Sequence, residues 1–235
     1  MDVAHIVSRF DEELNRIEAL LLEMGGLVES QISKSMQVLQ APKASVVDDI
    51  LAVDSRVNAL EREIDELSVK LLALRQPLGS DLRNAVSAMK VAGNLERIGD
   101  YAKSMARRVE PIHGNGQTKH ISFSSLVRMS EVVQGMLKDV LDAYVARDLE
   151  KAVSVWRRDD EVDNMYTSLF RELLTYMMEN PSHITAGMHL MFIAKTLERT
   201  GDHVTNIAEQ IHFLLTGDQL DDDAGLLRLV RGADD

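Results

Sequence analysis

The motif Leu95–Asp100 (LERIGD) recurs 102 positions later as Leu197–Asp202 (LERTGD), and this repetition decides how the 235-residue chain is organised. The similarity extends without a gap from Asp81–Ala106 to His183–Ala208, where 8 of 26 positions are identical. A fixed offset between similar segments indicates a repeated structural unit. We therefore interpret the chain as a duplication with one copy of the motif in each half.

The segments around both motifs have a helical pattern. Apolar residues recur at steps of three and four, as along a helix that packs over its whole length, for example at Val53, Val57, Leu60, Ile64, Leu67 and Leu71. The four prolines lie between such segments, because a helix interior does not tolerate them. Six long helices are predicted, over residues 4–40, 43–75, 80–109, 122–146, 148–178 and 181–216. In two sets of three, they predict an all-α fold of two tandem three-helix bundles related by an internal repeat.

The loops suggest the domain boundaries. Residues 113–118 contain two glycines and several polar residues, which favours a boundary between a first bundle over 1–112 and a second over 118–217. Residues 218–235 are expected to form an acidic, disordered tail. Ser80 or Asp81 is the expected N-cap of the third helix, and Gly217 is expected to close the last helix.

Composition excludes several classes of function. The net charge of −12 argues against a general nucleic-acid binder, which needs a basic face to displace counterions from phosphates. The absence of cysteine excludes disulfides, thiolate zinc sites and a cysteine nucleophile. The sequence has no run of about 18 apolar residues that could span a bilayer, and its first 18 residues lack the pattern of a signal peptide. We expect a cytoplasmic protein.

Each repeated motif contains a pair of acidic residues on one face of a helix. Glu96 and Asp100 are four residues apart, as are Glu198 and Asp202, so each pair is separated by about one helical turn. Both pairs continue an apolar stripe instead of lying opposite it. Unpaired carboxylates packed against a neighbouring helix cost several kcal/mol, on the order of a lost buried ion-pair partner, so we expect arginine, a proton or a metal ion to compensate them.

The second helix of each half offers a matching polar pair. Asp54 and Asn58 recur with the same spacing as Asp159 and Asp163, and two facing pairs would present four oxygen ligands. Oxygen ligands suit Mg, Mn, Ca or Fe ions better than thiophilic metals. Asn206 lies one turn beyond Asp202 as a further candidate ligand. The second half should bind metal more strongly, because the first half has Asn58 and Ser104 where the second has Asp163 and Asn206.

Other interpretations of the acidic pairs stay open. They could be solvated helix faces, or Arg97 and Arg199 could neutralise them in a purely structural helical dimer without metal. A carboxylate-bridged metalloenzyme would need inward-facing histidines, and the sequence has no paired Glu-x-x-His motif. His203 is expected at the surface and Trp156 in the core. Gly99 and Gly201 are expected to allow close approach of a helix or a bridging ion.

Several motifs together make the sequence resemble the PhoU family of phosphate-uptake regulators. The resemblance rests on both LERxGD motifs and on Phe10–Leu14 (FDEEL), Leu22–Glu29 (LEMGGLVE), Arg75–Arg83 (RQPLGSDLR) and Asp202–Glu209 (DHVTNIAE). It covers nearly the whole chain. No single one of these motifs would identify the family.

The resemblance implies a fold, ligands and partners. PhoU-like proteins are two-fold repeats of a three-helix bundle, often homodimeric, that bind metal ions through acidic motifs, in some cases as multinuclear clusters. The motifs correspond to Glu96–Asp100, Glu198–Asp202 and Asp159–Asp163, and in part to Asp54–Asn58. Family members are regulators and not enzymes. They link the ATPase of the phosphate ABC transporter to a sensor histidine kinase and repress the phosphate-starvation response. They are cytoplasmic and reach the membrane only through these partners.

Overall fold

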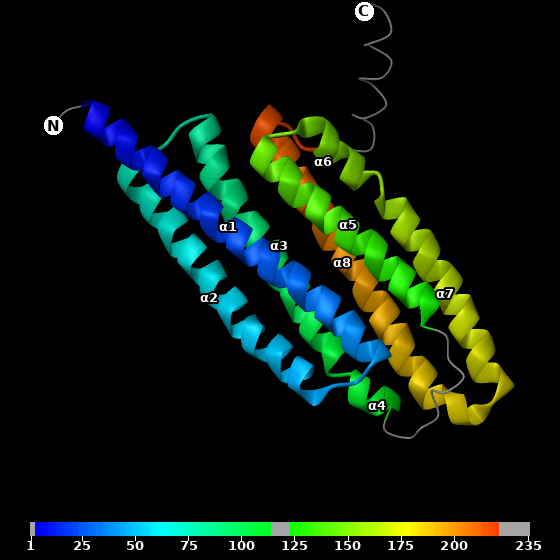
Figure 1. Cartoon of the computed structure of the whole chain (residues 1–235). Helices are drawn as coiled ribbons and strands as arrows, with labels where there is room; N and C mark the ends of the chain where they lie inside the picture. The colour runs from blue at the N-terminus through cyan, green and yellow to red at the C-terminus, as the bar shows by residue number, and fades with distance from the viewer. Residues whose placement is uncertain (1–2, 114–122, 221–235) are drawn as a thin grey trace, which may run out of the picture.

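The computed structural model describes residues 3–113 and 123–220, whose helices form two bundles that lie side by side (Figure 1). The first bundle consists of α1 (Val3–Gln40), α2 (Ala44–Arg75) and α3 (Ser80–Ala106). The second consists of α5 (Ser124–Ala146), α6 (Leu149–Trp156), α7 (Asp159–Glu179) and α8 (Ile184–Thr216). Two short elements, α4 (Val109–His113) and the 3₁₀ helix η2 (Pro181–His183), lie between the long helices. The predicted all-α fold is confirmed.

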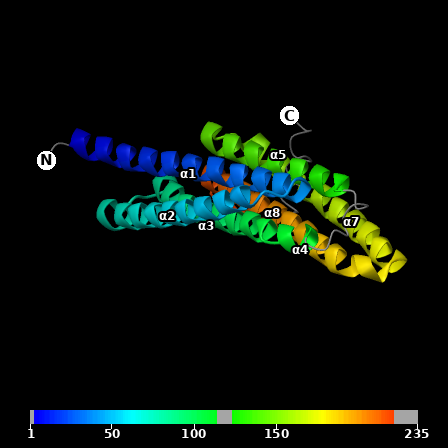
Figure 2. The same ribbon diagram turned by 60° about the horizontal axis from the view of Figure 1, so that its bottom comes forward.

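The two bundles meet through α3 and α8 and through α1 and α5, and both views show α3 and α8 near the middle of the molecule (Figure 2). The two central helices run antiparallel, because Arg83 Nε donates to the carbonyl oxygen of Leu214 at 3.3 Å while Tyr101 contacts His203. The rings of Tyr101 and His203 are 5.5 Å apart. These two residues occupy equivalent positions in the repeats, so the axis relating the repeats passes close to them.

Buried apolar side chains from both bundles form one continuous core. Fully buried members come from α1, α2, α3, α5 and α8, among them Val28, Leu60, Leu95, Met136 and Leu197. Each such side chain contributes about 1.5–3 kcal/mol on burial. The close contact of α1 with α5 depends on Gly25, because a Cβ atom there would lie 2.7 Å from Leu141 Cδ1.

The predicted fifth helix over 148–178 is wrong in one respect, because the structure divides it. Helix α6 ends at Trp156 and α7 begins at Asp159. The Arg158 N–H donates to the Val155 carbonyl at 3.0 Å, three residues back, which interrupts the four-residue ladder of an α-helix. Arg158 also pairs with Asp139 of α5 at 3.2 Å. The division places Asp159 at the start of a helix.

Both ends of α3 differ from the prediction, and the C-terminal end of α8 confirms it. Helix α3 ends at Ala106, and Pro111, expected between helices, lies within α4. The N-cap of α3 is neither Ser80 nor Asp81 but Gly79, whose φ of +59° lies in the region that favours glycine. Gly217 closes α8 as expected, with φ +84° and its N–H bonded to the Phe213 carbonyl at 2.9 Å.

Two predictions fall on parts of the chain that the structure does not describe. The boundary at 113–118 lies, apart from His113, outside the described residues, as do residues 221–235 of the predicted tail. The division into 1–112, 118–217 and 218–235 therefore stays a prediction. Among the described helices, none is long and apolar enough to cross a membrane.

Candidate metal centre

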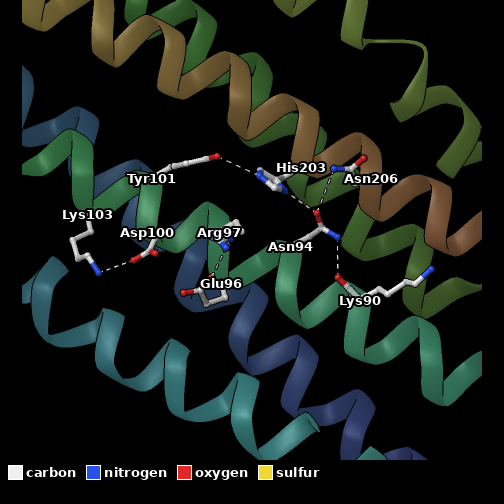
Figure 3. Close-up of polar contacts among 9 residues, drawn as sticks. All are labelled: Lys90, Asn94, Glu96, Arg97, Asp100, Tyr101, Lys103, His203 and Asn206. Atoms are coloured by element: carbon white, nitrogen blue, oxygen red, sulfur yellow. Dashed lines mark hydrogen bonds and ion pairs between the residues drawn. The ribbon is translucent and has the colours of Figure 1, made fainter.

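In the first repeat, the polar pair of α2 and the acidic pair of α3 lie on neighbouring helices, with Asp54 and Asp100 joined through one lysine. Lys103 Nζ bridges the two helices, at 2.8 Å from Asp54 Oδ2 and 2.6 Å from Asp100 Oδ1. Figure 3 shows Glu96 and Asp100 on the side of α3 that faces away from α8. Asp54 is only 7% exposed, and its Oδ1 is buried without a hydrogen-bond partner, as is Asn58 Oδ1.

A further carboxylate, Glu61, belongs to this site, and sequence analysis missed it. Burial, followed by the nearby charges of Asp100 and Glu61, raises the pKa of Glu96. Burial and then Asp65 raise the pKa of Glu61. Glu61 lies one turn after Asn58 on α2, a spacing that could have identified it. We name Asp54, Asn58, Glu61, Glu96 and Asp100 the first cluster.

The second repeat brings together Asp159 and Asp163 of α7 with Glu198 and Asp202 of α8, and we name these four the second cluster. Burial, then the charges of Asp202, Asp163, Asp160 and Glu198, raises the pKa of Asp159 to about 6. Burial and then Glu198 also raise the pKa of Asp202. Asp163 is exposed at the edge of the cluster. The four predicted residues therefore share one electrostatic environment.

The helix dipole partly offsets this repulsion. Asp159 is the first residue of α7, where exposed backbone N–H groups favour a negative charge. Sequence analysis had placed Asp159 inside a helix, so this stabilisation was not expected. Burial and the neighbouring carboxylates nevertheless raise the pKa of Asp159.

The repeated glycines allow the acid-bearing helices to approach closely, as expected. A Cβ atom at Gly201 would lie 3.3 Å from Val162 Cγ1, and one at Gly99 would lie 3.4 Å from Val57 Cγ1. Val57 and Val162 occupy equivalent positions between the acidic residues of α2 and of α7. At Gly99 a Cβ atom would also lie 3.1 Å from the buried Gln31 Oε1. The same local contact is therefore built in both repeats.

Lysines, not arginines, are the nearest cations in both clusters. Lys195 forms an ion pair with Glu198 Oε1, while Glu198 Oε2 is buried without a partner. Arg97 is largely exposed, and its ion pair is with Glu96 at 3.9 Å. Arg199 lowers the pKa of Asp202, but burial and the charge of Glu198 raise that pKa more strongly. The interpretation that arginines neutralise the motifs therefore applies only in part, to Arg97 with Glu96. Both lysines lie three residues from an acid of the motif, a signal that sequence analysis missed.

Two residues lie elsewhere than expected. His203 is half-buried between the repeats and not at the surface: its Nδ1 donates to Asn94 Oδ1 at 2.8 Å, and Tyr101 lies 3.4 Å from its Nε2. Burial, then Arg97 and Arg199, lowers the pKa of His203. Asn206 Nδ2 lies 3.5 Å from the same Asn94 oxygen. Its amide therefore contacts α3 (Figure 3). Trp156 is half-buried against the core.

The donor chemistry of the clusters fits a hard cation. Three buried oxygens, of Asp54, Asn58 and Glu198, have no hydrogen-bond partner, and leaving such an atom unsatisfied costs about 1–3 kcal/mol. Across residues 3–113 and 123–220, no three His, Asp or Glu side chains converge closely enough to hold a metal ion as they stand. Metal binding would thus require carboxylates to turn toward a common point.

Comparison with known proteins gives a consistent result over nearly the whole chain. The PhoU domain model matches residues 21–109 and 126–211, one match in each repeat. A phosphate-specific transport system accessory protein PhoU homolog from Caulobacter vibrioides is 46% identical over 216 residues, which cover 92% of this chain and 94% of that protein. The homolog of the same name from Rhizobium meliloti is 44% identical over 93% of this chain and 92% of its own length.

Solved structures agree with the sequence relatives. The crystal structure of PhoU from Pseudomonas aeruginosa has a TM-score of 0.85 and 38% identity, covering 89% of this chain and 100% of that one. The phosphate transport system regulatory protein PhoU from Streptococcus pneumoniae has a TM-score of 0.83 and 31% identity, covering 90% of this chain and 99% of that one. With a family-model match in each repeat and relatives this similar, the chain belongs to the PhoU family.

Proposed function

We propose that this chain is a metal-binding regulatory adaptor of phosphate uptake and phosphate-starvation signalling. Its relatives are named accessory proteins of the phosphate-specific transport system, and the match covers both repeats. None of these names describes an enzyme, which agrees with a regulatory role. The observation that carries the metal-binding part is the pair of inward-facing acidic clusters with unpartnered buried oxygens.

The residues that would hold the metal are the oxygen donors of the two clusters. In the second cluster these are Asp159, Asp163, Glu198 and Asp202; in the first they are Asp54, Asn58, Glu61, Glu96 and Asp100. Mg, Mn or Fe ions suit such ligands. A bound divalent ion would neutralise the repelling carboxylates and join α7 to α8, or α2 to α3.

In the proposed regulatory role, the protein connects two partners at the cytoplasmic side of the membrane. One is the ATPase of the phosphate ABC transporter, and the other is the phosphate sensor histidine kinase, whose response the adaptor represses when phosphate is plentiful. The protein acts as a homodimer and reaches the membrane through these partners. The names of the relatives support the link to the transporter, and the family resemblance supports the link to the kinase.

A deletion strain tests this proposal. Loss of the gene should leave a phosphate-starvation promoter active in phosphate-rich medium, and the wild-type gene should restore repression. A Glu198→Gln and Asp202→Asn variant should restore it poorly and should contain less metal on elemental analysis. The control variant, Glu66→Gln with Glu131→Gln, makes the same charge change at exposed positions and should behave as wild type. Full repression in the deletion strain, without a second copy of the gene, would contradict the regulatory role.

A further inference from the structure

The first cluster already contains a cation, the ammonium group of Lys103. Its Nζ lies 2.8 Å from Asp54 Oδ2 and 2.6 Å from Asp100 Oδ1, so it binds one carboxylate from each of the two facing helices. Figure 3 shows the contact with Asp100. Asp54 is more than nine-tenths buried, and its second oxygen has no partner. A charge-assisted bridge of this kind replaces part of the hydration that buried carboxylates lose.

The second cluster has no equivalent bridge. The position that corresponds to Lys103 is Thr205, whose hydroxyl donates to the Asp202 carbonyl at 2.8 Å. Lys195 pairs with Glu198 on its own helix and contacts α7 at the ring of Tyr166, 5.2 Å from its Nζ, and not at a carboxylate. In the described part of the chain, Asp159, Asp163 and Asp202 form no ion pair within 4.0 Å. The two repeats therefore differ in where their compensating charge comes from.

A metal ion in the first cluster would compete with the Lys103 ammonium group for the same two carboxylates. Divalent cations bind carboxylate oxygens at about 2.0–2.6 Å, so an ion between α2 and α3 would share Asp54 and Asp100 with Lys103 and would lie close to its positive charge. We propose that Lys103 is a built-in competitor for the metal, which weakens metal binding at the first cluster and favours binding at the second cluster. The inference rests on the metal binding proposed above and adds the residue that makes loading unequal.

Mn²⁺ binding to the full chain tests this proposal in a background where the second cluster is disabled by Glu198→Gln and Asp202→Asn. Lys103→Met removes the charge but retains the length of the side chain, and Lys103→Gln is a second neutral variant. Lys103→Arg retains the charge. Lys70→Met makes the same charge change at an exposed position of α2 and serves as the control.

Removal of the Lys103 charge should increase Mn²⁺ affinity of this background by about tenfold or more, since a like charge within about 4–6 Å shifts a binding equilibrium by one or more powers of ten. Isothermal titration should show that the neutral Lys103 variants bind up to one Mn²⁺ ion per chain at the first cluster. Mn²⁺ should also raise the unfolding temperature of the Lys103→Met variant more than that of its parent. Lys103→Arg and Lys70→Met should change neither quantity.

The outcomes separate this inference from the proposed function. If the wild type binds Mn²⁺ through the second cluster but neither neutral Lys103 variant gains affinity while retaining helical circular dichroism, the inference is wrong and the proposed function stands. If the neutral variants gain Mn²⁺ and the wild type binds none, Lys103 competes as inferred but the second cluster is not the metal site. If no variant binds Mn²⁺, both are wrong.

Discussion

The two repeats present the same acidic motif in different surroundings. In the first, α2 is unbroken through Asp54, and a lysine from α3 bridges the facing acids. In the second, α7 begins at Asp159, and its acids face α8 without a bridging cation. The first cluster also has Glu61. The equivalent residue of the second repeat is Tyr166, whose ring centroid lies 5.2 Å from Lys195 Nζ in a cation–π contact. Duplication has thus conserved the helix contact while the charge balance of the two sites has diverged.

This difference teaches that backbone geometry and charge compensation can change separately. Gly99 and Gly201 still place α2 against α3 and α7 against α8. Compensation, in contrast, comes from whichever nearby side chain can reach: Lys103 in one repeat, Lys195 and a helix N-terminus in the other.

The largest expected effect concerns metal affinity. Glu198→Gln with Asp202→Asn should weaken Mn²⁺ binding about a hundredfold or more, because direct ligands contribute at least as much as the outer-shell groups whose loss costs about 10–100-fold. Glu96→Gln with Asp100→Asn should weaken it tenfold at most, since Lys103 already occupies that cluster. Isothermal titration of the purified proteins measures both. Equal losses in the two double variants would show that the repeats are loaded alike.

The next effect concerns packing at the shared glycines. Gly99→Ala should lower the free energy of unfolding by about 1–3 kcal/mol, as overpacked sites do, because its Cβ atom would press on Gln31, which is fixed by a 3.1 Å hydrogen bond to the Ile50 carbonyl. At Gly201 the added Cβ atom is close only to the Val162 Cγ1 methyl group, at 3.3 Å, with Val162 Cβ and Asp159 Oδ1 in ordinary contact at 3.7 and 3.8 Å, so Gly201→Ala should cost less. Urea unfolding measures both changes.

Gly93→Ala is the control for the glycine series. It lies on α3 with nothing within 4 Å of the added atom, and it should gain up to about 1 kcal/mol from helix propensity. A loss of stability for Gly93→Ala as large as that for Gly99→Ala would show that close approach is not the reason for the glycines.

Much of this architecture could be predicted from sequence because it depends on periodicity. The six helical segments and the facing of α2 on α3 and of α7 on α8 follow from apolar spacing and from acids four residues apart. The break at Arg157 and Arg158 could not, since arginine is a good helix former and the contact of Arg158 with Asp139 of α5 is not visible in the local sequence.

The compensating residues were harder to predict for a different reason. Lys103 and Lys195 have no counterparts in the opposite repeat, so comparing the repeats did not reveal them, and the same is true of Glu61. Asn206 was expected to extend the second cluster, but its amide contacts Asn94 across α3 and α8. That contact depends on how the two bundles cross, which the repeat alone does not specify.

Exchanging residues between the clusters should produce a smaller effect. Asn58→Asp gives the first cluster the acid that the second has at this position, and the added charge beside a buried, unpartnered oxygen should lower stability by about 1–2 kcal/mol without metal. Asp163→Asn, at an exposed position, should change stability by at most about 0.5 kcal/mol. Thermal unfolding in EDTA measures both, and equal effects would contradict the asymmetry in burial.

The smallest effect concerns pH. The pKa of Asp159 is about 6 in the folded protein against 3.8 ordinarily, so between these values the folded state binds a proton that the unfolded state releases. Stability from this group is therefore fully present below about pH 4 and is lost as pH rises through 6. In EDTA, Asp159→Asn should be more stable than wild type at pH 7.5, by about 1 kcal/mol after allowance for solvent screening, and the difference should shrink at pH 4.5.

Metal binding should reverse the sign of this pH dependence. Mn²⁺ requires the deprotonated carboxylate, so wild type with Mn²⁺ should gain stability above pH 6, where the metal-free protein loses it. Asp159→Asn should show neither trend, while Asp160→Asn, an exposed neighbour on the same turn, should retain both. If the difference in free energy of unfolding between wild type and Asp159→Asn stayed constant from pH 4.5 to 7.5, the pKa of Asp159 would not be raised by its acidic neighbours. The repulsion in the second cluster would then fall mainly on Asp202, whose pKa burial and Glu198 also raise.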